Sequence, residues 1–241
     1  MRYAVLSDVH ANLEATGAVL EDISLRGISE MIFIGDAVGY GPEPNECIAL
    51  LNDRCRVFLA GNHDWASVGL TDTRYFTENA RHAVEWTSTV LSEKNRDLLK
   101  TLPIVHDETE TDMFFVHSTP RDPEEWHYIL TLRDAELNLE YCTRRFCFIG
   151  HSHQPFIIER VPSGELITYR EKTGIREGSR YMINAGSVGQ PRDGDPRACY
   201  AVIDDRSVEI VRVPYPIASV QEKMRKKKLP PMLIERLSSG T

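Results

Sequence analysis

Short apolar runs alternate with longer amphipathic segments along the first part of the chain. Residues 3–6, 31–34 and 57–59 are short apolar runs, while residues 13–25 and 43–52 carry apolar side chains at helical spacing. Short runs of this kind are typical of buried strands, and the periodic segments between them are typical of crossover helices. The pattern predicts a sheet of parallel strands joined by helices.

The rest of the chain has a different pattern, with two helical segments and many closely spaced strands. The helices are expected at residues 77–99 and 131–143. The strands are expected at residues 104–109, 113–116, 146–149, 156–161, 165–169, 181–183, 198–203 and 208–213. Turn residues such as Pro162-Ser163-Gly164 separate several of them, which favours antiparallel hairpins. The expected fold class is therefore α/β, with two mixed sheets packed face to face and helices outside.

No linker, repeat or low-complexity segment divides the chain. Its 241 residues are enough for one large α/β domain, so we expect residues 1–241 to form a single domain. Residues 216–241 or thereabouts form a predicted helical tail. Its basic side chains are interpreted as a solvated helix face and are Lys223, Arg225, Lys226, Lys227 and Lys228.

Charge and cysteine content exclude several classes of protein. The formal net charge of -8 argues against a general affinity for nucleic-acid backbones, although bound cations can reverse the local charge of a nuclease site. The five cysteines include no Cys-x-x-Cys pair, so neither a disulfide framework nor a zinc ribbon is expected. Reduced cysteines and the absence of a recognisable signal or membrane segment lead us to expect a cytoplasmic protein.

Five polar patches, each following an apolar run, carry the candidate chemistry. They are Asp8-Val9-His10, Gly35-Asp36, Gly61-Asn62-His63-Asp64, His117 and Gly150-His151-Ser152-His153. Sites in α/β sheets lie at the carboxyl ends of strands, so these patches are expected to meet. Most of the patches, taken singly, also fit a turn or a structural histidine. Together they predict a two-metal hydrolytic centre.

The spacing within the patches suggests how ligands reach the ions. Alternate residues of a strand point the same way, so Asp8 and His10 can share an ion. His151 and His153 have the same spacing, and they can bind one ion together or one ion each at a shared site. The carboxylate of Asp36 can bridge two ions with its two oxygens, which an imidazole cannot do.

The third patch combines a candidate ligand with a candidate catalytic histidine. Asn62 offers a neutral amide oxygen to a metal ion. His63 is close enough to protonate a leaving group, and Asp64 is expected to orient that imidazole.

The predicted ligand set contains two carboxylates, one amide and four imidazoles, with no thiolate. The seven ligands are Asp8, His10, Asp36, Asn62, His117, His151 and His153. This mixture indicates manganese, iron, zinc, cobalt or nickel in preference to a site for magnesium alone.

The order of these motifs resembles the calcineurin-like metallophosphoesterase superfamily. Asp-x-His, Gly-Asp, Gly-Asn-His-Asp, His and Gly-His-x-His follow one another between Asp8 and His153. Residues 39–42, 118–123 and 184–192 further resemble the small prokaryotic branch of that family. The resemblance implies a four-layer α/β/β/α sandwich.

The resemblance also implies a role for each ligand. Asp8, His10, Asp36 and His153 would hold one ion, and Asp36, Asn62, His117 and His151 would hold the second. His63 would be the catalytic histidine. The cofactors would be two divalent ions, with manganese expected first.

The implied function is hydrolysis of a phosphomonoester or phosphodiester by a hydroxide that bridges the two ions. Arg121 and Arg192 are candidate substrate contacts, although either also fits a surface ion pair. Hydrolysis of a dinucleoside polyphosphate and nuclease activity are alternatives, and the acidic chain disfavours the nuclease. An alternative of another class is a metal-binding scaffold without turnover, which the presence of His63 disfavours.

The expected partner is a small phosphorylated or nucleotide-like substrate. Neither a nucleic acid nor a membrane is expected as a partner, and a homo-oligomer is possible.

Residues 71–101 are a candidate lid over the site. Trp65, Tyr75, Phe76 and Trp86 lie in or beside this segment, although packing in the core is the commoner role of such aromatic side chains.

Overall fold

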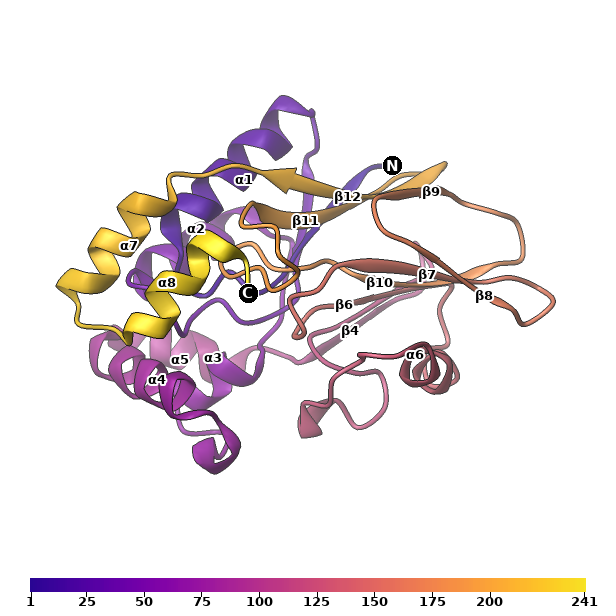
Figure 1. Cartoon of the computed structure of the whole chain (residues 1–241). Helices are drawn as coiled ribbons and strands as arrows, with labels where there is room; N and C mark the ends of the chain where they lie inside the picture. The colour runs from indigo at the N-terminus through magenta and orange to yellow at the C-terminus, as the bar shows by residue number, and fades with distance from the viewer.

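The computed structural model describes all residues, 1–241 (Figure 1). Its strands are β1 (Tyr3–Leu6), β2 (Glu30–Phe33), β3 (Val57–Phe58), β4 (Val105–Glu108), β5 (Met113–Val116), β6 (Phe146–Ile149), β7 (Phe156–Arg160), β8 (Leu166–Tyr169), β9 (Lys172–Gly174), β10 (Arg180–Asn184), β11 (Ala198–Ile203) and β12 (Ser207–Val213). Its α-helices are α1 (Leu13–Leu25), α2 (Pro44–Arg54), α3 (Asn62–Ser67), α4 (Glu78–Val90), α5 (Glu93–Thr101), α6 (Leu132–Leu139), α7 (Ile217–Lys226) and α8 (Pro231–Ser239). None of these helices has the length and apolar character that a membrane span requires.

The strands form two six-stranded mixed sheets. The first has the order β3-β2-β1-β11-β12-β9, and its strands β1, β2 and β3 are parallel. The second has the order β4-β5-β6-β10-β7-β8, and its strands β5, β6 and β10 are parallel. All other neighbouring strands pair antiparallel. The predicted α/β fold of two mixed sheets is confirmed.

Three apolar clusters define the layers. The cluster between the sheets contains Val5 and Ile32 from the first sheet and Phe115 and Phe148 from the second. A larger cluster joins the other face of the first sheet to α1, α2, α7 and α8, with α4 and α5 at its margin. A small cluster packs α6 alone on the outer face of the second sheet (Figure 1). The four layers are therefore unequal, because one outer layer contains a single helix.

Two long helices predicted from the sequence are each broken in the structure. The predicted helix at residues 77–99 divides into α4 and α5 at Leu91, and the hydroxyl of Ser92 caps α5 by accepting the Asn95 amide at 3.3 Å. The predicted helical tail divides into α7 and α8 before Pro231. Proline disfavours helical backbone in the residue before it, and it fits the first turn of a new helix.

Two elements were missed by the sequence prediction. Strand β9 is only three residues long and forms the edge of the first sheet beside β12. Helix α3 begins at Asn62, in a segment where the sequence pattern predicted no helix.

The basic side chains of the C-terminal tail are not all solvated. The ammonium of Lys223 lies 2.8 Å from the carboxylate of Glu14 and 2.7 Å from that of Glu43. The other four basic side chains are exposed, as predicted. Lys223 is the exception because it fastens α7 to α1 and to the start of α2.

Candidate metal centre

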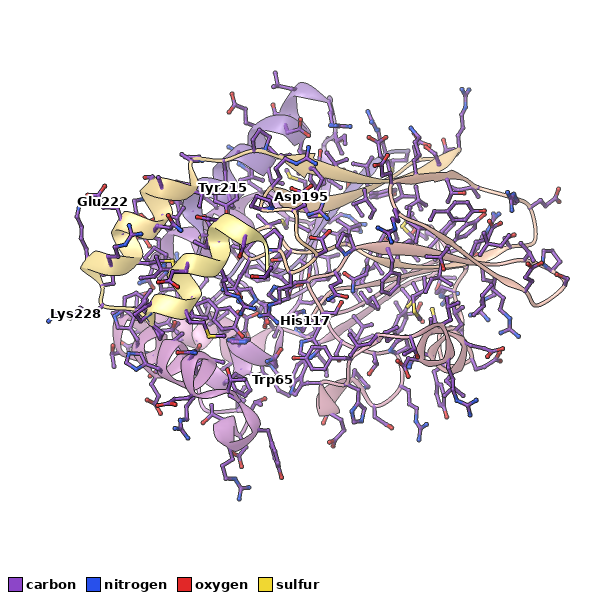
Figure 2. The ribbon with its side chains drawn as sticks, in the orientation of Figure 1. Trp65, His117, Asp195, Tyr215, Glu222 and Lys228 are labelled. Carbon is purple, nitrogen blue, oxygen red and sulfur yellow. The ribbon has the colours of Figure 1, made fainter.

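The loops after β1, β2, β5 and β6 meet where the two sheets come together. The backbone amide of Asp8 donates to Gly35 and that of His10 donates to Asp36, both at 3.0 Å, which joins the loops after β1 and β2. The amide of His151 donates to the Asp8 carboxylate at 3.0 Å, which ties the second sheet to the first. Figure 2 shows the labelled His117 in the interior, between the C-terminal helices and the strands.

The backbone of these loops adopts an uncommon conformation. Five predicted ligands have φ between 48° and 65°: Asp8, His10, Asp36, His151 and His153. Left-handed backbone costs roughly 1–2 kcal/mol at a residue with a side chain, and such strain clusters at functional sites. The expectation that Asp8 and His10 lie on a strand is wrong, whereas His151 and His153 follow their strand as expected. Strand β1 ends at Leu6 and β6 ends at Ile149, so both pairs lie in loops.

The first group of convergent ligands consists of Asp8, His10 and His153, all buried. The Nε2 atoms of the two histidines are 3.1 Å apart. The Oδ1 atom of Asp8 lies 3.1 Å from His153 Nε2 and 3.7 Å from His10 Nε2. These three atoms thus surround one small volume.

The second group consists of Asp36, His117 and His151, which are also buried. The Oδ2 atom of Asp36 lies 3.3 Å from His117 Nε2, and it also lies 3.6 Å from His10 Nε2 in the first group. A single carboxylate oxygen of Asp36 therefore faces both groups, whereas a bridge through both oxygens was expected; the other oxygen, Oδ1, accepts the backbone amide of His63.

Backbone carbonyls hold the imidazoles in place. The Nδ1 atoms of His10, His117 and His153 donate to the carbonyls of Val38 (2.9 Å), Ile34 (3.1 Å) and Gln190 (2.5 Å), respectively. His151 is turned the other way, because its Nε2 donates to the Trp126 carbonyl at 2.9 Å. Hydrogen bonds of this kind fix the tautomer of a metal-binding histidine and leave the opposite nitrogen free as a ligand.

The atoms left without partners fit a pair of cations. In their carbonyl-bound tautomers, His10 and His153 direct two lone pairs at each other, and no hydrogen atom lies between these nitrogens. Three further buried atoms have no hydrogen-bond partner: Asp8 Oδ1, Asn62 Oδ1 and His117 Nε2. Buried polar atoms are normally satisfied, and a bound metal ion would satisfy all of these together.

The charges of the centre also favour a cation. Burial opposes a charge on His117, but the carboxylates of Asp36 and Asp8 outweigh it and raise its pKa to about 9. Burial lowers the pKa of His151 to about 3 and that of His153 to about 4, so these rings stay neutral and able to bind metal. The negative potential that draws a proton to His117 acts equally on a metal ion.

His63 lies at the edge of the ligand groups. Its ring centroid is 4.9 Å from that of His10 and 4.4 Å from that of Tyr40, and its Nδ1 is buried without a partner. Burial lowers the pKa of His63 well below its usual value, which keeps the ring neutral. The backbone amide of His63 donates to Asp36 Oδ1 at 2.8 Å. That bond fixes the start of α3 against the ligand loops.

Asp64 has a different role from the predicted one. Its carboxylate accepts the backbone amides of Asp36 (2.8 Å), Gly61 (2.9 Å) and Val38 (3.1 Å), and it makes no hydrogen bond to the His63 ring. Burial and the neighbouring Asp36 raise the pKa of Asp64 to about 7. Asp64 therefore positions the loops that carry the ligands, and the predicted contact with the imidazole is wrong.

A cavity of about 690 Å³ opens beside the ligand groups. Asn62, His63 and His151 form its floor. Aromatic side chains form much of its wall, namely Tyr40, Trp65, Tyr75, Phe76, Trp126 and Tyr128. Its volume is within the range of sites for small organic ligands.

The cavity separates the two predicted substrate arginines. Arg192 lines it. Arg121 does not, because its exposed guanidinium pairs with Asp122 at 3.2 Å and lies over the ring of Tyr141. The prediction that Arg121 contacts the substrate is wrong in this structure. The alternative, a surface ion pair, is the one observed.

Only part of the candidate lid borders the cavity. Tyr75 and Phe76, from the loop before α4, line it together with Trp65 from α3. Trp86 instead packs against the core beside the first sheet. This segment thus forms one wall, while the buried faces of α4 and α5 pack on the core and their other faces are exposed.

The fold and this site are those of a metallophosphoesterase. The family model of the calcineurin-like phosphoesterase superfamily domain matches residues 1–207. The chain therefore belongs to the calcineurin-like phosphoesterase superfamily, and the resemblance noted in its motifs is confirmed.

Relatives of this chain resemble it over nearly its whole length. A metallophosphoesterase from Sphaerobacter thermophilus is 39% identical, and its crystal structure has a TM-score of 0.87 over 100% of this chain and 99% of that one. An uncharacterized protein from Methanocaldococcus jannaschii is 39% identical over 98% of this chain and 97% of its own length. A hypothetical protein from Pyrococcus horikoshii, at 20% identity, shares the fold with a TM-score of 0.81 over 100% of this chain and 98% of that one.

Several residues at the site were missed by the sequence analysis. Trp126 and Tyr128 line the cavity from the segment between β5 and α6. Arg236 and Met232 reach the cavity from α8. A motif search could not find these four residues, since they lie far in sequence from the patches and follow no strand.

Proposed function

We propose that this protein is a metal-dependent phosphoesterase that hydrolyses a phosphomonoester or phosphodiester bond of a small substrate. The observation that carries the proposal is the set of buried ligand atoms that face one another without hydrogen-bond partners. Membership of a phosphoesterase superfamily supports the reaction class. A purely structural role for these residues would leave this strained, unsatisfied cluster without a compensating interaction.

We assign the ligands as two overlapping sets. Asp8, His10 and His153 would hold one divalent ion, and Asn62, His117 and His151 would hold the other, with Asp36 shared between them. Manganese is the expected ion, and iron, zinc, nickel and cobalt suit the same donors. Ions bound there would lower the pKa of a water molecule and offset negative charge on the phosphoryl oxygens.

The residues around the ions would complete the reaction. The oxygen of water bonds to phosphorus, the bond from phosphorus to the leaving oxygen breaks, and that oxygen takes up a proton. His63 lies between the ligand groups and the cavity, where its neutral ring can donate a hydrogen bond to the phosphoryl group or to the leaving oxygen. Asp64 and the carbonyls of Val38, Ile34 and Gln190 would hold the ligands still during the reaction.

Hydrolysis of two chromogenic esters tests the proposal. Protein stripped with a chelator and reloaded with manganese should hydrolyse p-nitrophenyl phosphate or bis-p-nitrophenyl phosphate, and the stripped protein should not. The ester that is hydrolysed faster would show whether the protein is mainly a monoesterase or a diesterase. Tight manganese binding without turnover of either ester would contradict the proposal and favour a metal-binding scaffold.

The role of His63 can be separated from metal binding. His63→Ala should lose about 100-fold or more in kcat, because loss of one hydrogen-bond donor to the transition state costs roughly that much, while it retains the manganese content of the wild type. His82→Ala is the matched control, because His82 is an exposed histidine of α4. A His63→Ala variant that kept full turnover would remove His63 from the mechanism.

A further inference from the structure

The C-terminal helices lie outside the matched family domain but take part in the cavity. The family model ends at residue 207, whereas α7 and α8 span residues 217–239. In Figure 1 the yellow helix α8 lies beside α4. The Nδ2 atom of Asn79 on α4 lies 2.8 Å from the sulfur of Met232 on α8, which places α8 against the cavity wall.

Helix α8 brings a second arginine beside Arg192. The Nη2 atom of Arg192 donates to Gln190 Oε1 at 3.0 Å, and the Nη1 atom of Arg236 donates to the same oxygen at 3.4 Å. The Nε atom of Arg236 donates to the carbonyl of Thr241, while the Nε atom of Arg192 is buried and has no partner. Burial and the neighbouring Arg192 lower the pKa of Arg236.

No Asp or Glu carboxylate lies within 4.0 Å of either guanidinium, although most other arginines of this chain form ion pairs. The Thr241 oxygen that Arg236 Nε contacts belongs to the last residue of the sequence, and Arg192 has no contact of this kind. Two partly buried cations that share one neutral acceptor repel each other. They favour an anion between or in front of them, since guanidinium groups bind phosphate with paired hydrogen bonds. We call Arg192 and Arg236 the arginine pair.

The arginine pair is close to the metal ligands. The guanidinium carbon of Arg192 is 5.5 Å from the centroid of the Tyr40 ring. That ring centroid is in turn 4.5 Å from that of His10 and 4.4 Å from that of His63. A single side chain therefore separates the arginine pair from the residues that would hold the reacting phosphoryl group. A group attached to that phosphoryl group can reach the pair.

The acidic side chains of the cavity do not neutralise the arginine pair. Asp72, Glu124 and Glu125 line the cavity from other loops, and Asp72 is bound to Arg74 at 2.5 Å. The aromatic wall leaves room for an organic group beyond the phosphates. The cavity thus offers a cationic subsite next to the metal ligands and an aromatic wall farther along.

We propose that the arginine pair binds a second phosphoryl group of the substrate, so that the site prefers organic molecules with two adjacent phosphoryl groups over simple monoesters. The inference rests on the proposed function and names its substrate class. Helix α8 is then a specificity element, because it supplies Arg236 from outside the matched family domain.

Calorimetric binding of non-hydrolysable ligands to the manganese-loaded protein tests this inference. Methylenediphosphonate should bind more tightly than methylphosphonate. In Arg236→Gln the ratio of the two affinities should fall about tenfold, as expected for the loss of a charged hydrogen bond. In Arg236→Lys the ratio should fall less. Arg225→Gln is the matched control, since Arg225 is an exposed arginine of α7 outside the cavity; this variant should keep the full preference.

Two outcomes would overturn the inference. The first is an unchanged preference in Arg236→Gln that still has the wild-type melting temperature. The second is a loss of malonate affinity in Arg236→Gln that is as large as the loss of methylenediphosphonate affinity. This would mean that the pair recognises carboxylates as well as phosphates. The result is independent of turnover: a protein that binds the diphosphonate through Arg236 but hydrolyses no ester would sustain the subsite and contradict the proposed reaction.

Discussion

At the scale of single residues, the candidate metal centre is built from backbone that is costly to form. Asp36 and four other ligands have left-handed backbone, and hydrogen bonds to Asp64 and to nearby carbonyls hold the loops in that conformation. Glycines allow the loops to pack closely. Gly39 has a φ of +84°, and a Cβ atom added to it would lie 2.5 Å from His63 Nδ1. The position of His63 therefore depends on the absence of a side chain at residue 39.

Gly39→Ala should displace the His63 ring and lower kcat by about 100-fold, since a misplacement of about 1 Å costs that much. Manganese content should stay at the wild-type value, because residue 39 supplies no ligand. Steady-state kinetics and metal analysis of the same preparation measure both quantities.

Gly164→Ala separates this clash from backbone strain. Gly164 also has a positive φ, +92°, but an added Cβ would meet nothing within 4 Å. The Gly164→Ala variant should therefore lose about 1 kcal/mol of stability because of backbone strain, and it should keep full activity. Equal losses of activity in the two variants would show that backbone strain, and not contact with His63, causes the effect.

At the scale of elements, the C-terminal helices depend on a partly buried ion pair as well as on apolar packing. Lys223 contacts Glu14 and Glu43, which are only 12% and 20% exposed. Its own side chain is 37% exposed, so solvent screens part of the interaction. Val220 and Met224 of α7 are buried on either side of it.

Lys223→Ala should destabilise the protein by about 1 kcal/mol and lower its melting temperature by about 2–4 °C. Lys227→Ala, on the exposed end of the same helix, should change the free energy of unfolding by less than about 0.5 kcal/mol. Thermal unfolding of the two variants compares them directly. A Lys223→Ala variant as stable as Lys227→Ala would mean that apolar packing alone fastens the helices.

The sequence predicted most elements because their patterns are strong. The buried strands at residues 3–6 and 146–149 are continuous apolar runs, and both are found as expected. The break at Leu91 was missed because no glycine or proline marks it, and tertiary packing ends α4 there. Strand β9 was missed because it has polar residues and depends on pairing with β12.

The site could be predicted in its residue types but not in its geometry. The candidate ligands that converge in the structure were predicted from their chemistry and their place after strands. The left-handed loops were not foreseen, since this conformation has no signal in the residue types of Asp8 or His10. Arg236 was not foreseen because only the packing of α8 brings it to Arg192.

At the scale of the whole molecule, a buried polar network lies beside the core between the two sheets. The carboxylate of Glu159 is fully buried and accepts the hydroxyls of Tyr169 (2.8 Å) and Tyr181 (3.0 Å) and the guanidinium of Arg176 (3.1 Å). Burial alone would raise the pKa of Glu159, but these donors outweigh it and lower the pKa below 4.5. A buried carboxylate therefore makes stability depend on pH.

Because its folded pKa is lowered, Glu159 stabilises the protein above pH 4.5, and this contribution is lost as the pH falls toward the folded pKa. Glu159→Gln should be less stable than the wild type by about 2 kcal/mol at neutral pH, and the difference should shrink below about pH 4.5. Denaturant unfolding across this range measures it. A difference that stays constant with pH would show that the charge of Glu159 contributes nothing.

The central claim is that ligands from both sheets hold two metal ions around Asp36. Anomalous diffraction from crystals of the manganese-loaded protein tests it most directly. The account predicts two peaks per chain, one within reach of Asp8, His10 and His153 and one within reach of Asn62, His117 and His151, with Asp36 between them. A single peak, or two peaks that Asp36 does not share, would contradict it.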